Sequence, residues 1–432
     1  MPSFSKRLGL IRQFAEVPDG VGPATDYSGR TPRLTVFELL LIDRKVLREA
    51  PHAKAHEAQF AAFITASRRC WEQAKREFTV PQKAVLESAL DVSQEMLIML
   101  KIISREIRLA SRPEGLPTAA NFALTQTELE PLQDREVLVR NLFMSVDPYM
   151  RGRMNEGRSY VPPFELGKPL DGGAVGEVVE SLAQEFKPGD AVTSNFGWRE
   201  YFVAAPRQLH AVSGEIHPLS AYLGALGMTG MTAWAGLRLV EVRAGDTVFI
   251  SGAAGAVGSV AGQLAKVRRC RVIGSAGSEE KIKFLLEECG FDAAFNYKAG
   301  PLLEQLNLAA PEGINVYFDN VGGEMLEAVL SAMRVHGRII ACGGISGYNE
   351  EKPRPGPSNL FNFITKRLTM KGLIVSDWMD HQAEFEKEVG GYFKAGRVKH
   401  QETVVKGIDR AVDAFIGLFE GRNIGKMIVE LV

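Results

Sequence analysis

Residues 251–263 read SGAAGAVGSVAGQ, a stretch made mainly of glycine and alanine. An apolar, β-branched run comes before it and a helix-like run follows it. Within it, Ala253, Gly255 and Gly258 have the spacing of a dinucleotide-binding turn between a strand and a helix. Alanine replaces the first glycine of the commonest pattern, and Val257 lies inside the same turn. The sequence predicts a turn whose backbone and free N–H groups bind a pyrophosphate; a tight turn without a ligand is the alternative.

Strand-like and helix-like runs alternate on both sides of this turn. DTVFISG comes before it, and CRVIGSAG, DAAFNY, INVYFDNVG and GRIIACGG are further apolar runs with helical runs among them. Alternating strands and helices are typical of a parallel sheet with helices on both faces. We therefore predict an α/β fold with a doubly wound parallel (Rossmann) sheet.

The segment after the second predicted strand bears on which dinucleotide binds. NAD sites usually carry an acidic residue about 20 residues after the turn, to bind the ribose diol. Residues 274–278 read GSAGS instead, and Lys281 follows within one helical turn. Ser278 and Lys281 suit a 2′-phosphate, so the sequence favours NADP(H). Glu279 and Glu280 are explained as first-turn acids that complement the helix dipole, and Lys281 as a plain surface residue is the alternative.

Composition excludes several classes of protein. The net charge of −1 gives no electrostatic case for nucleic acid or an anionic membrane as the main partner. The apolar runs are shorter than the roughly 20 residues of a membrane helix. The four cysteines form no CxxC pair, so neither a disulfide framework nor a zinc ribbon is indicated. A reducing, cytoplasmic location is therefore expected.

Two segments before residue 223 differ in character. Residues 104–222 hold short β-like runs separated by Gly, Pro and Asp, which predicts a β-rich, barrel-like unit. This segment contains no cysteine, and its His210 and His217 lack the setting of zinc ligands. No metal is therefore expected. Carbonyl polarisation would come from hydrogen bonds, and tyrosines in Gly- and Pro-rich loops are the candidate donors.

Residues 1–103 read mainly as helices, with apolar positions three and four residues apart. Three explanations stay open for this extension. It is a fused helical module for oligomerisation or regulation, a different small domain, or the result of a start assigned upstream of Met96 or Met99.

Residues 105–432 resemble the zinc-independent branch of the medium-chain dehydrogenase/reductase superfamily, and within it the group of prostaglandin, alkenal double-bond and curcumin reductases. The resemblance rests on stretches in the family's order, among them MSVDPYMRGRM, SGAAGAVGSVAGQLAK, YFDNVGG, GGISGYN and GRNIGKMIVEL. It implies a GroES-like catalytic domain formed by residues 104–222 and 397–432, with an NADP-binding Rossmann domain, residues 223–396, inserted in it.

The resemblance also implies an activity and assigns residues to it. The implied reaction is metal-free, NADPH-dependent reduction of the carbon–carbon double bond of an α,β-unsaturated ketone or aldehyde, with hydride delivered to the β-carbon. Tyr149 is the preferred catalytic donor, Tyr348 supports the nicotinamide ribose or the substrate pocket, and Tyr160 lines that pocket. The remaining positions that match cofactor contacts are Gly230, Thr232, Tyr297, Asn320, Gly344 and Asn423.

Other functions stay open at this stage. An NADPH quinone reductase and a non-enzymatic NADPH-binding sensor are alternatives, because a fold alone does not specify a function. The expected substrate is small and apolar, and a homodimer is an assembly open to such a chain.

Overall fold

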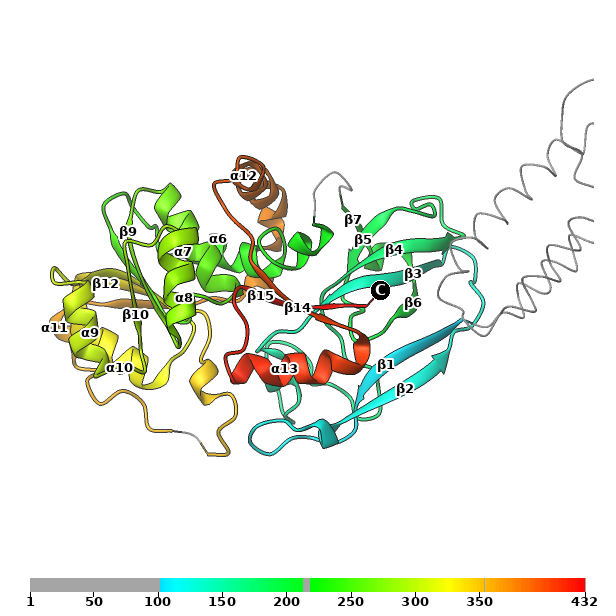
Figure 1. Cartoon of the computed structure of the whole chain (residues 1–432), viewed down its shortest axis with the longest axis horizontal. Coiled ribbons are helices and arrows are strands. Elements are labelled where there is room, and N and C mark those ends of the chain that lie inside the picture. The colour runs from blue at the N-terminus through cyan, green and yellow to red at the C-terminus, as the bar shows by residue number, and fades with distance from the viewer. Residues whose placement is uncertain (1–101, 213–217, 353, 432) are drawn as a thin grey trace, which may run out of the picture. The chain divides into compact units, whose positions relative to one another are not determined.

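The structure is a computed structural model that describes residues 102–212, 218–352 and 354–431. All of them belong to one compact unit, Met96–Val432. The predicted helical extension lies outside the described residues apart from its last two, and Ile103 already begins a strand. The described residues form two lobes, each built around its own sheet (Figure 1).

The first lobe, here called the parallel-sheet lobe, contains a six-stranded sheet in the order β10-β9-β8-β11-β12-β13, with every neighbouring pair parallel. Its strands are β8 (Thr247–Ile250), β9 (Arg271–Ala276), β10 (Ala293–Asn296), β11 (Ile314–Asp319), β12 (Met333–Ala341) and β13 (Thr369–Gly372). The strand order reverses direction between β8 and β11. Ligands of doubly wound sheets bind at such a switch point, beside the carboxyl ends of the strands.

Helices cover both faces of this sheet. Val248 and Ile250 of β8 pack in a cluster with α6, α7 and α12, whereas Phe249 between them packs in a cluster with α9 and α10. Alternate side chains of a strand point to opposite faces, so both faces are buried and the strand is apolar throughout. The helices are α6 (Met228–Leu239), α7 (Ala256–Val267), α8 (Glu279–Lys283) with its π-helical continuation η5 (Phe284–Glu288), α9 (Leu302–Ala309), α10 (Gly323–Ala332), α11 (Asn362–Thr365) and α12 (Gln382–Lys394).

The second lobe, here called the mixed-sheet lobe, contains a seven-stranded sheet in which β6 also pairs with β3. Its strands are β3 (Val137–Ser145), β4 (Ala174–Ser181), β5 (Ala191–Ser194), β6 (Tyr201–Ala204), β7 (His210–Ala211), β14 (Glu402–Lys406) and β15 (Lys426–Glu430). The last two strands come from the C-terminal end of the chain, and β15 pairs antiparallel with β3. The parallel-sheet lobe therefore lies, in sequence, between two parts of the mixed sheet.

Smaller elements complete this lobe and the connections. A two-stranded ribbon joins β1 (Ile103–Leu109) to β2 (Phe122–Glu128), and α5 (Met150–Arg153) and α13 (Ala411–Phe419) pack beside the mixed sheet. Short 3-10 turns are η2 (Ala119–Asn121), η3 (Pro206–Gln208), η4 (Leu219–Leu223), η6 (Ile345–Gly347), η7 (Val375–His381) and η8 (Ile408–Arg410). Within the described ranges, no helix is long and apolar enough to cross a membrane.

Candidate active site

The glycine-rich turn connects β8 to α7 at the switch point. Gly252 has a φ of +58°, a conformation that favours glycine, and Gly255 is the N-cap of α7. A Cβ on Gly258 would lie 2.6 Å from the Gly252 carbonyl oxygen, so helix and turn pack too closely for any side chain. Ala253 is fully buried, and Val257 packs against the core cluster.

The start of α7 is open to an anion. Gly255 has no side chain to cap the free N–H groups of the first helical turn. The C-terminal loop reaches the same turn, because the Gly425 N–H donates a hydrogen bond to the Ala254 carbonyl oxygen at 2.8 Å. Asn423, in that loop, donates from its side-chain amide to the Gly425 carbonyl oxygen at 2.8 Å. Asn423 therefore stabilises a loop that contacts the turn.

A cluster of polar and cationic groups lies beyond the end of β9. Ser278 is the N-cap of α8 and accepts a hydrogen bond from the Lys281 N–H. The Lys281 ammonium donates to the Gly421 carbonyl oxygen at 2.7 Å, and burial lowers its pKa, as does nearby Lys298. The Lys298 ammonium lies 5.7 Å from the centre of the Tyr297 ring. Lys298 thus lies beside Tyr297, and Lys281 lies near both Lys298 and the Glu280 carboxylate.

A buried polar network holds the ends of β8 and β11 together. The Asp319 carboxylate, 2% exposed, accepts hydrogen bonds from the Tyr317 hydroxyl at 2.6 Å and from the N–H of Gly322 at 2.8 Å. The Asn320 side-chain amide donates to the Ser251 carbonyl oxygen at 2.8 Å. Asn320 is therefore fixed directly beside the glycine-rich turn.

The loop after β12 returns to the same place. The N–H groups of Cys342 and Gly343 both donate to the Asp319 carbonyl oxygen, and the Gly344 N–H donates to the Tyr348 hydroxyl oxygen at 3.3 Å. Gly344 has a φ of −136°, and a Cβ there would meet nothing within 4 Å. Neither backbone strain nor packing inside the protein requires glycine at this position.

Tyr149 is the N-cap of α5 and packs, partly buried, against the apolar cluster of the mixed-sheet lobe. Its hydroxyl has no hydrogen-bond partner among the described residues. Burial raises the pKa of Tyr149 above the ordinary tyrosine value, and the Asp147 carboxylate raises it further. The hydroxyl therefore keeps its proton and is free to donate it in a hydrogen bond.

The three predicted tyrosines gather at one place. Tyr160 is close enough to Tyr149 to raise the pKa of that hydroxyl further, and the pKa of Tyr160 is raised first by burial and then by Tyr348 and Cys342. The Tyr160 side chain is 62% exposed, whereas burial raises the pKa of Tyr348. Tyr149 belongs to the mixed-sheet lobe and Tyr348 to the parallel-sheet lobe, so the candidate site lies between the lobes.

Gly230 and Thr232, both on α6, take part in local packing. A Cβ on Gly230 would lie 1.9 Å from the Ala225 carbonyl oxygen, so the backbone excludes a side chain there. The Thr232 hydroxyl donates to the Met228 carbonyl oxygen one helical turn earlier, at 2.7 Å. These contacts explain both residue types without a ligand, and a contact with the cofactor stays a prediction.

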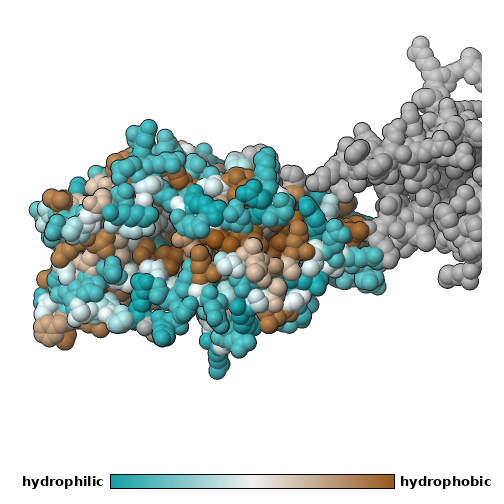
Figure 2. All heavy atoms as spheres, turned by 60° about the horizontal axis from the view of Figure 1, so that its bottom comes forward, coloured by the Kyte–Doolittle hydropathy of each residue, from teal (hydrophilic) through white to brown (hydrophobic). Residues whose placement is uncertain are grey.

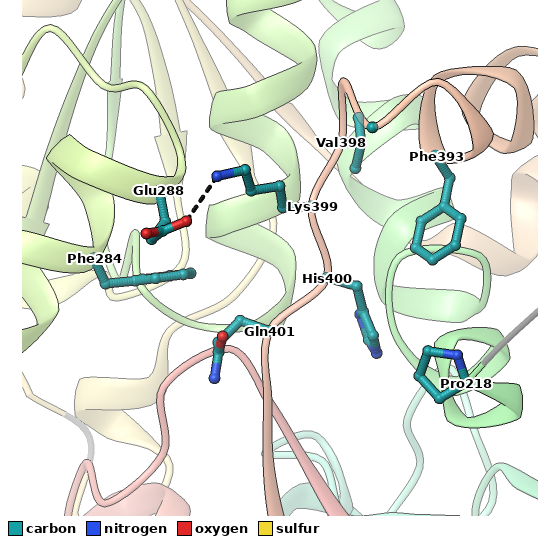
Figure 3. A pocket seen from close by; sticks show the side chains of 9 residues that line it. Pro218, Phe284, Glu288, Phe393, Val398, Lys399, His400 and Gln401 are labelled. Carbon is teal, nitrogen blue, oxygen red and sulfur yellow. Dashed lines mark hydrogen bonds and ion pairs between the residues drawn. The ribbon is translucent and has the colours of Figure 1, made fainter.

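A separate pocket of about 390 Å³ lies beside the segment that connects α12 to β14 (Figure 3). The Lys399 ammonium and the Glu288 carboxylate form an ion pair there at 2.7 Å. None of the residues predicted from the sequence lines this pocket. Over the described ranges, no group of three or more His, Cys, Asp or Glu side chains is arranged to hold a metal ion.

The structure also places residues at the site that sequence reasoning missed. Three further residues lie next to residues that were predicted from the sequence. They are Lys298 beside Tyr297, Cys342 near Tyr160, and Gly252 in the glycine-rich turn. Arg151 lies in the MSVDPYMRGRM stretch, and its place two residues after Tyr149 is the signal that the sequence offers for it.

Comparison with known proteins agrees with this geometry. Residues 105–212 match the family described as the N-terminal domain of oxidoreductase, and residues 256–389 match zinc-binding dehydrogenase. The chain is 43% identical over 342 residues to the 2-alkenal reductase (NADP(+)-dependent) of Nicotiana tabacum, with 76% of this chain and 98% of that protein covered. It is 37% identical over 329 residues to the NADPH-dependent curcumin reductase of Escherichia coli (strain K12), with 75% and 95% covered.

A solved structure is similar over the same region. CurA from Vibrio vulnificus in complex with NADPH gives a TM-score of 0.73 at 39% identity, with 76% of this chain and 99% of that chain covered. A glycine-rich turn at the switch point of a parallel sheet, beside a second lobe built on a mixed sheet, defines the chain as a two-lobed α/β protein. The chain belongs to the medium-chain dehydrogenase/reductase superfamily.

Proposed function

We propose that this protein is an NADPH-dependent reductase of carbon–carbon double bonds conjugated to a carbonyl group. The observation that carries the proposal is the gathering of tyrosines from both lobes, one of them on the loop after β12 whose N–H groups donate to the Asp319 carbonyl oxygen at the end of β11. The related proteins from tobacco and Escherichia coli are named as NADP-dependent reductases of an alkenal and of curcumin, which are conjugated carbonyl compounds.

The residues of the site fit NADPH. The uncapped start of α7 offers N–H groups to a pyrophosphate. Lys281 and Lys298 offer two positive charges to a 2′-phosphate. The nearby Glu279 carboxylate accepts a hydrogen bond from the Asn296 side-chain amide at 3.1 Å, so it already has a partner within the protein. The open space beside Gly344 leaves room for close approach of the cofactor. The residues proposed to contact it are Gly230, Thr232, Ala253, Gly255, Val257, Gly258, Ser278, Lys281, Tyr297, Asn320, Gly344 and Asn423.

The proposed catalytic role of the protein is to stabilise negative charge on the substrate carbonyl oxygen. Bound NADPH supplies a hydride for the β-carbon of the substrate. The Tyr149 hydroxyl donates a hydrogen bond to the carbonyl oxygen, where charge develops. Because burial raises the pKa of Tyr149, we favour hydrogen-bond donation to the carbonyl oxygen as its main role, and the α-carbon takes its proton from Tyr149 or from water. Tyr348 lies across the site, with its hydroxyl oriented by the Gly344 N–H.

An apolar substrate suits this surface. Figure 2 shows hydrophobic side chains gathered in a band along the middle of one face, between hydrophilic rims. Tyrosine hydroxyls and few charges recognise a carbonyl oxygen attached to an apolar body. We propose a small enone or enal, and the cytoplasm as the location of the reaction.

An assay of NADPH oxidation with a panel of enones, enals and quinones tests the proposal. We expect turnover with enones and enals, and a saturated carbonyl product by mass spectrometry. Turnover confined to quinones would favour quinone reduction. Tight NADPH binding without any turnover would favour a sensor.

The N-terminal residues outside the described ranges provide a further prediction. Deleting residues 1–95 is expected to leave an active reductase, because the compact unit Met96–Val432 contains both sheets. We propose that the catalytic domain consists of residues 104–222 and 397–432, and that the nucleotide domain consists of residues 223–396. Thermal unfolding and kcat of the truncated and full chains provide the comparison. An insoluble or inactive product would assign the extension to the core or to an essential interface.

We propose a homodimer built on the edge of the parallel sheet. Among the strands that the structure describes, β13 pairs with β12 alone; all four of its residues are exposed, and Met370 is 39% exposed. Phe361 and Ile364, each 69% exposed, lie just before it in sequence. An unprotected edge strand beside exposed apolar side chains is typical of an interface. A second copy would extend the sheet across a two-fold axis.

Sedimentation of the purified chain measures this directly. We expect twice the 47.3 kDa mass of one chain, and a shift toward the monomer for Phe361→Glu. Leu308→Glu is the matched control, because Leu308 is 83% exposed on α9, which packs beside β10 at the opposite edge of the sheet. A monomeric parent chain would refute the dimer.

A further inference from the structure

Arg151 is a buried cation whose hydrogen-bond partners are all neutral. The residue is 3% exposed. Its guanidinium donates to the carbonyl oxygens of Pro113 and Gly115, at 3.2 and 2.9 Å, and to the side-chain oxygens of Asn155 and Asn349, at 2.5 and 3.2 Å. Within the described ranges, no carboxylate forms an ion pair with it.

A buried charge without a counter-ion is costly to the folded state. The arrangement instead uses the geometry of the guanidinium. Its planar fork spreads N–H donors over three nitrogens, so it reaches acceptors that lie farther apart than those that the single ammonium nitrogen of a lysine can reach. The contacts of Arg151 therefore show which segments it holds together.

These contacts connect the two sides of the candidate site. Arg151 lies in α5, which begins directly after Tyr149, and Asn349 directly follows Tyr348. The hydrogen bond between them joins residues 198 positions apart, one in each lobe. Gly115, a third partner, has a φ of +66°, and a Cβ there would lie 3.9 Å from the Asn349 carbonyl oxygen. The loop around Gly115 thus closely approaches the loop that carries Tyr348.

We propose that Arg151 is a positioning residue that fixes Tyr149 and Tyr348 relative to each other through its hydrogen bond to Asn349. This inference rests on the proposed function, in which hydroxyls from both lobes act on one substrate. Tyr149 and Tyr348 belong to separate lobes, so a shift of one lobe against the other changes the distance between their hydroxyls. Misplacement of a catalytic group by about 1 Å can lower the rate on the order of 10²-fold.

The chain offers a matched pair of variants for the test. Asn349→Ala removes the acceptor in the other lobe, whereas Asn155→Ala removes an acceptor of the same guanidinium within α5's own lobe. We expect Asn349→Ala to lower kcat roughly tenfold, the effect of one lost hydrogen bond to a charged group, with KM for NADPH within about twofold of the parent. Asn155→Ala should keep kcat within about twofold. Asn349→Asp keeps an acceptor oxygen and should restore most of kcat.

Hydrogen exchange provides a readout that does not depend on activity. Amides of residues 344–350 should exchange faster in Asn349→Ala than in the parent chain, and those in Asn155→Ala should match the parent. If Asn349→Ala has the same amide exchange and the same kcat as the parent chain, the proposal is wrong. It is also wrong if Asn155→Ala loses as much kcat as Asn349→Ala does. A parent chain that reduces no enone while the exchange difference persists would refute the proposed function but retain the link between the lobes.

Discussion

Replacing Tyr149 with phenylalanine is expected to lower kcat for the best enone by about 10²–10⁴-fold, the usual effect of losing one such donor or acid. The ring stays and its packing against the apolar cluster is kept, so only the hydroxyl is lost. That hydroxyl has no partner among the described residues, so no buried group is left unsatisfied. Binding of NADPH, measured by fluorescence titration, should not change.

Two further variants make this result specific. Tyr392→Phe removes a hydroxyl from α12, far along the chain from the tyrosine cluster, and should leave kcat unchanged. Tyr348→Phe removes the hydroxyl on the other side of the site. Nearly wild-type turnover of Tyr149→Phe, with hydride transfer shown to limit the rate, would make Tyr149 a packing residue. A large loss in Tyr348→Phe alone would then assign the donor role to Tyr348.

Lys281→Glu is expected to weaken NADPH binding by about 10- to 150-fold, since a charge-assisted phosphate contact contributes roughly 1.5–3 kcal/mol. NADH lacks the 2′-phosphate, so its dissociation constant should change far less. The same helix supplies the control. Lys283→Glu makes an identical change of charge at a side chain that is 71% exposed and faces Glu287. Isothermal titration of both cofactors against both variants gives the four dissociation constants.

The outcome distinguishes a specific contact between Lys281 and the 2′-phosphate from a general change of the electrostatic potential around α8. Equal weakening of NADPH and NADH by Lys281→Glu would remove Lys281 from the phosphate site. An equal effect of Lys283→Glu on NADPH would show that any positive charge on α8 suffices. Lys298, which lowers the pKa of Lys281, is the residue to exchange next in that case.

The parallel sheet could be predicted from the sequence because burial on both faces makes its strands continuous apolar runs. β8 and β11 show this pattern clearly. β13 does not, because all four of its residues are exposed at the sheet edge. Its pairing with β12 depends on the fold and not on a local pattern, so sequence reasoning missed it.

The local structure of the candidate site could be predicted from the sequence where short-range packing determines it. The spacing of Gly255 and Gly258 predicted the strand–turn–helix, and a Cβ on Gly258 would lie 2.6 Å from the Gly252 carbonyl oxygen. Cofactor binding at this turn stays a prediction. The contact between Arg151 and Asn349 has no such signal, because it joins residues from two lobes. At Gly230 the family resemblance predicts a contact with the cofactor. Packing inside the protein is by itself enough to explain why this residue is a glycine.

Transfer of deuterium from NADPH labelled at C4 of the nicotinamide tests the central claim most directly. The protein is incubated with an enone and each labelled epimer separately, and the product is examined by NMR and mass spectrometry. The account predicts a saturated ketone that carries one deuterium on the β-carbon, from one epimer only. Deuterium on the carbonyl carbon of an allylic alcohol, or a saturated product without label from either epimer, would contradict it.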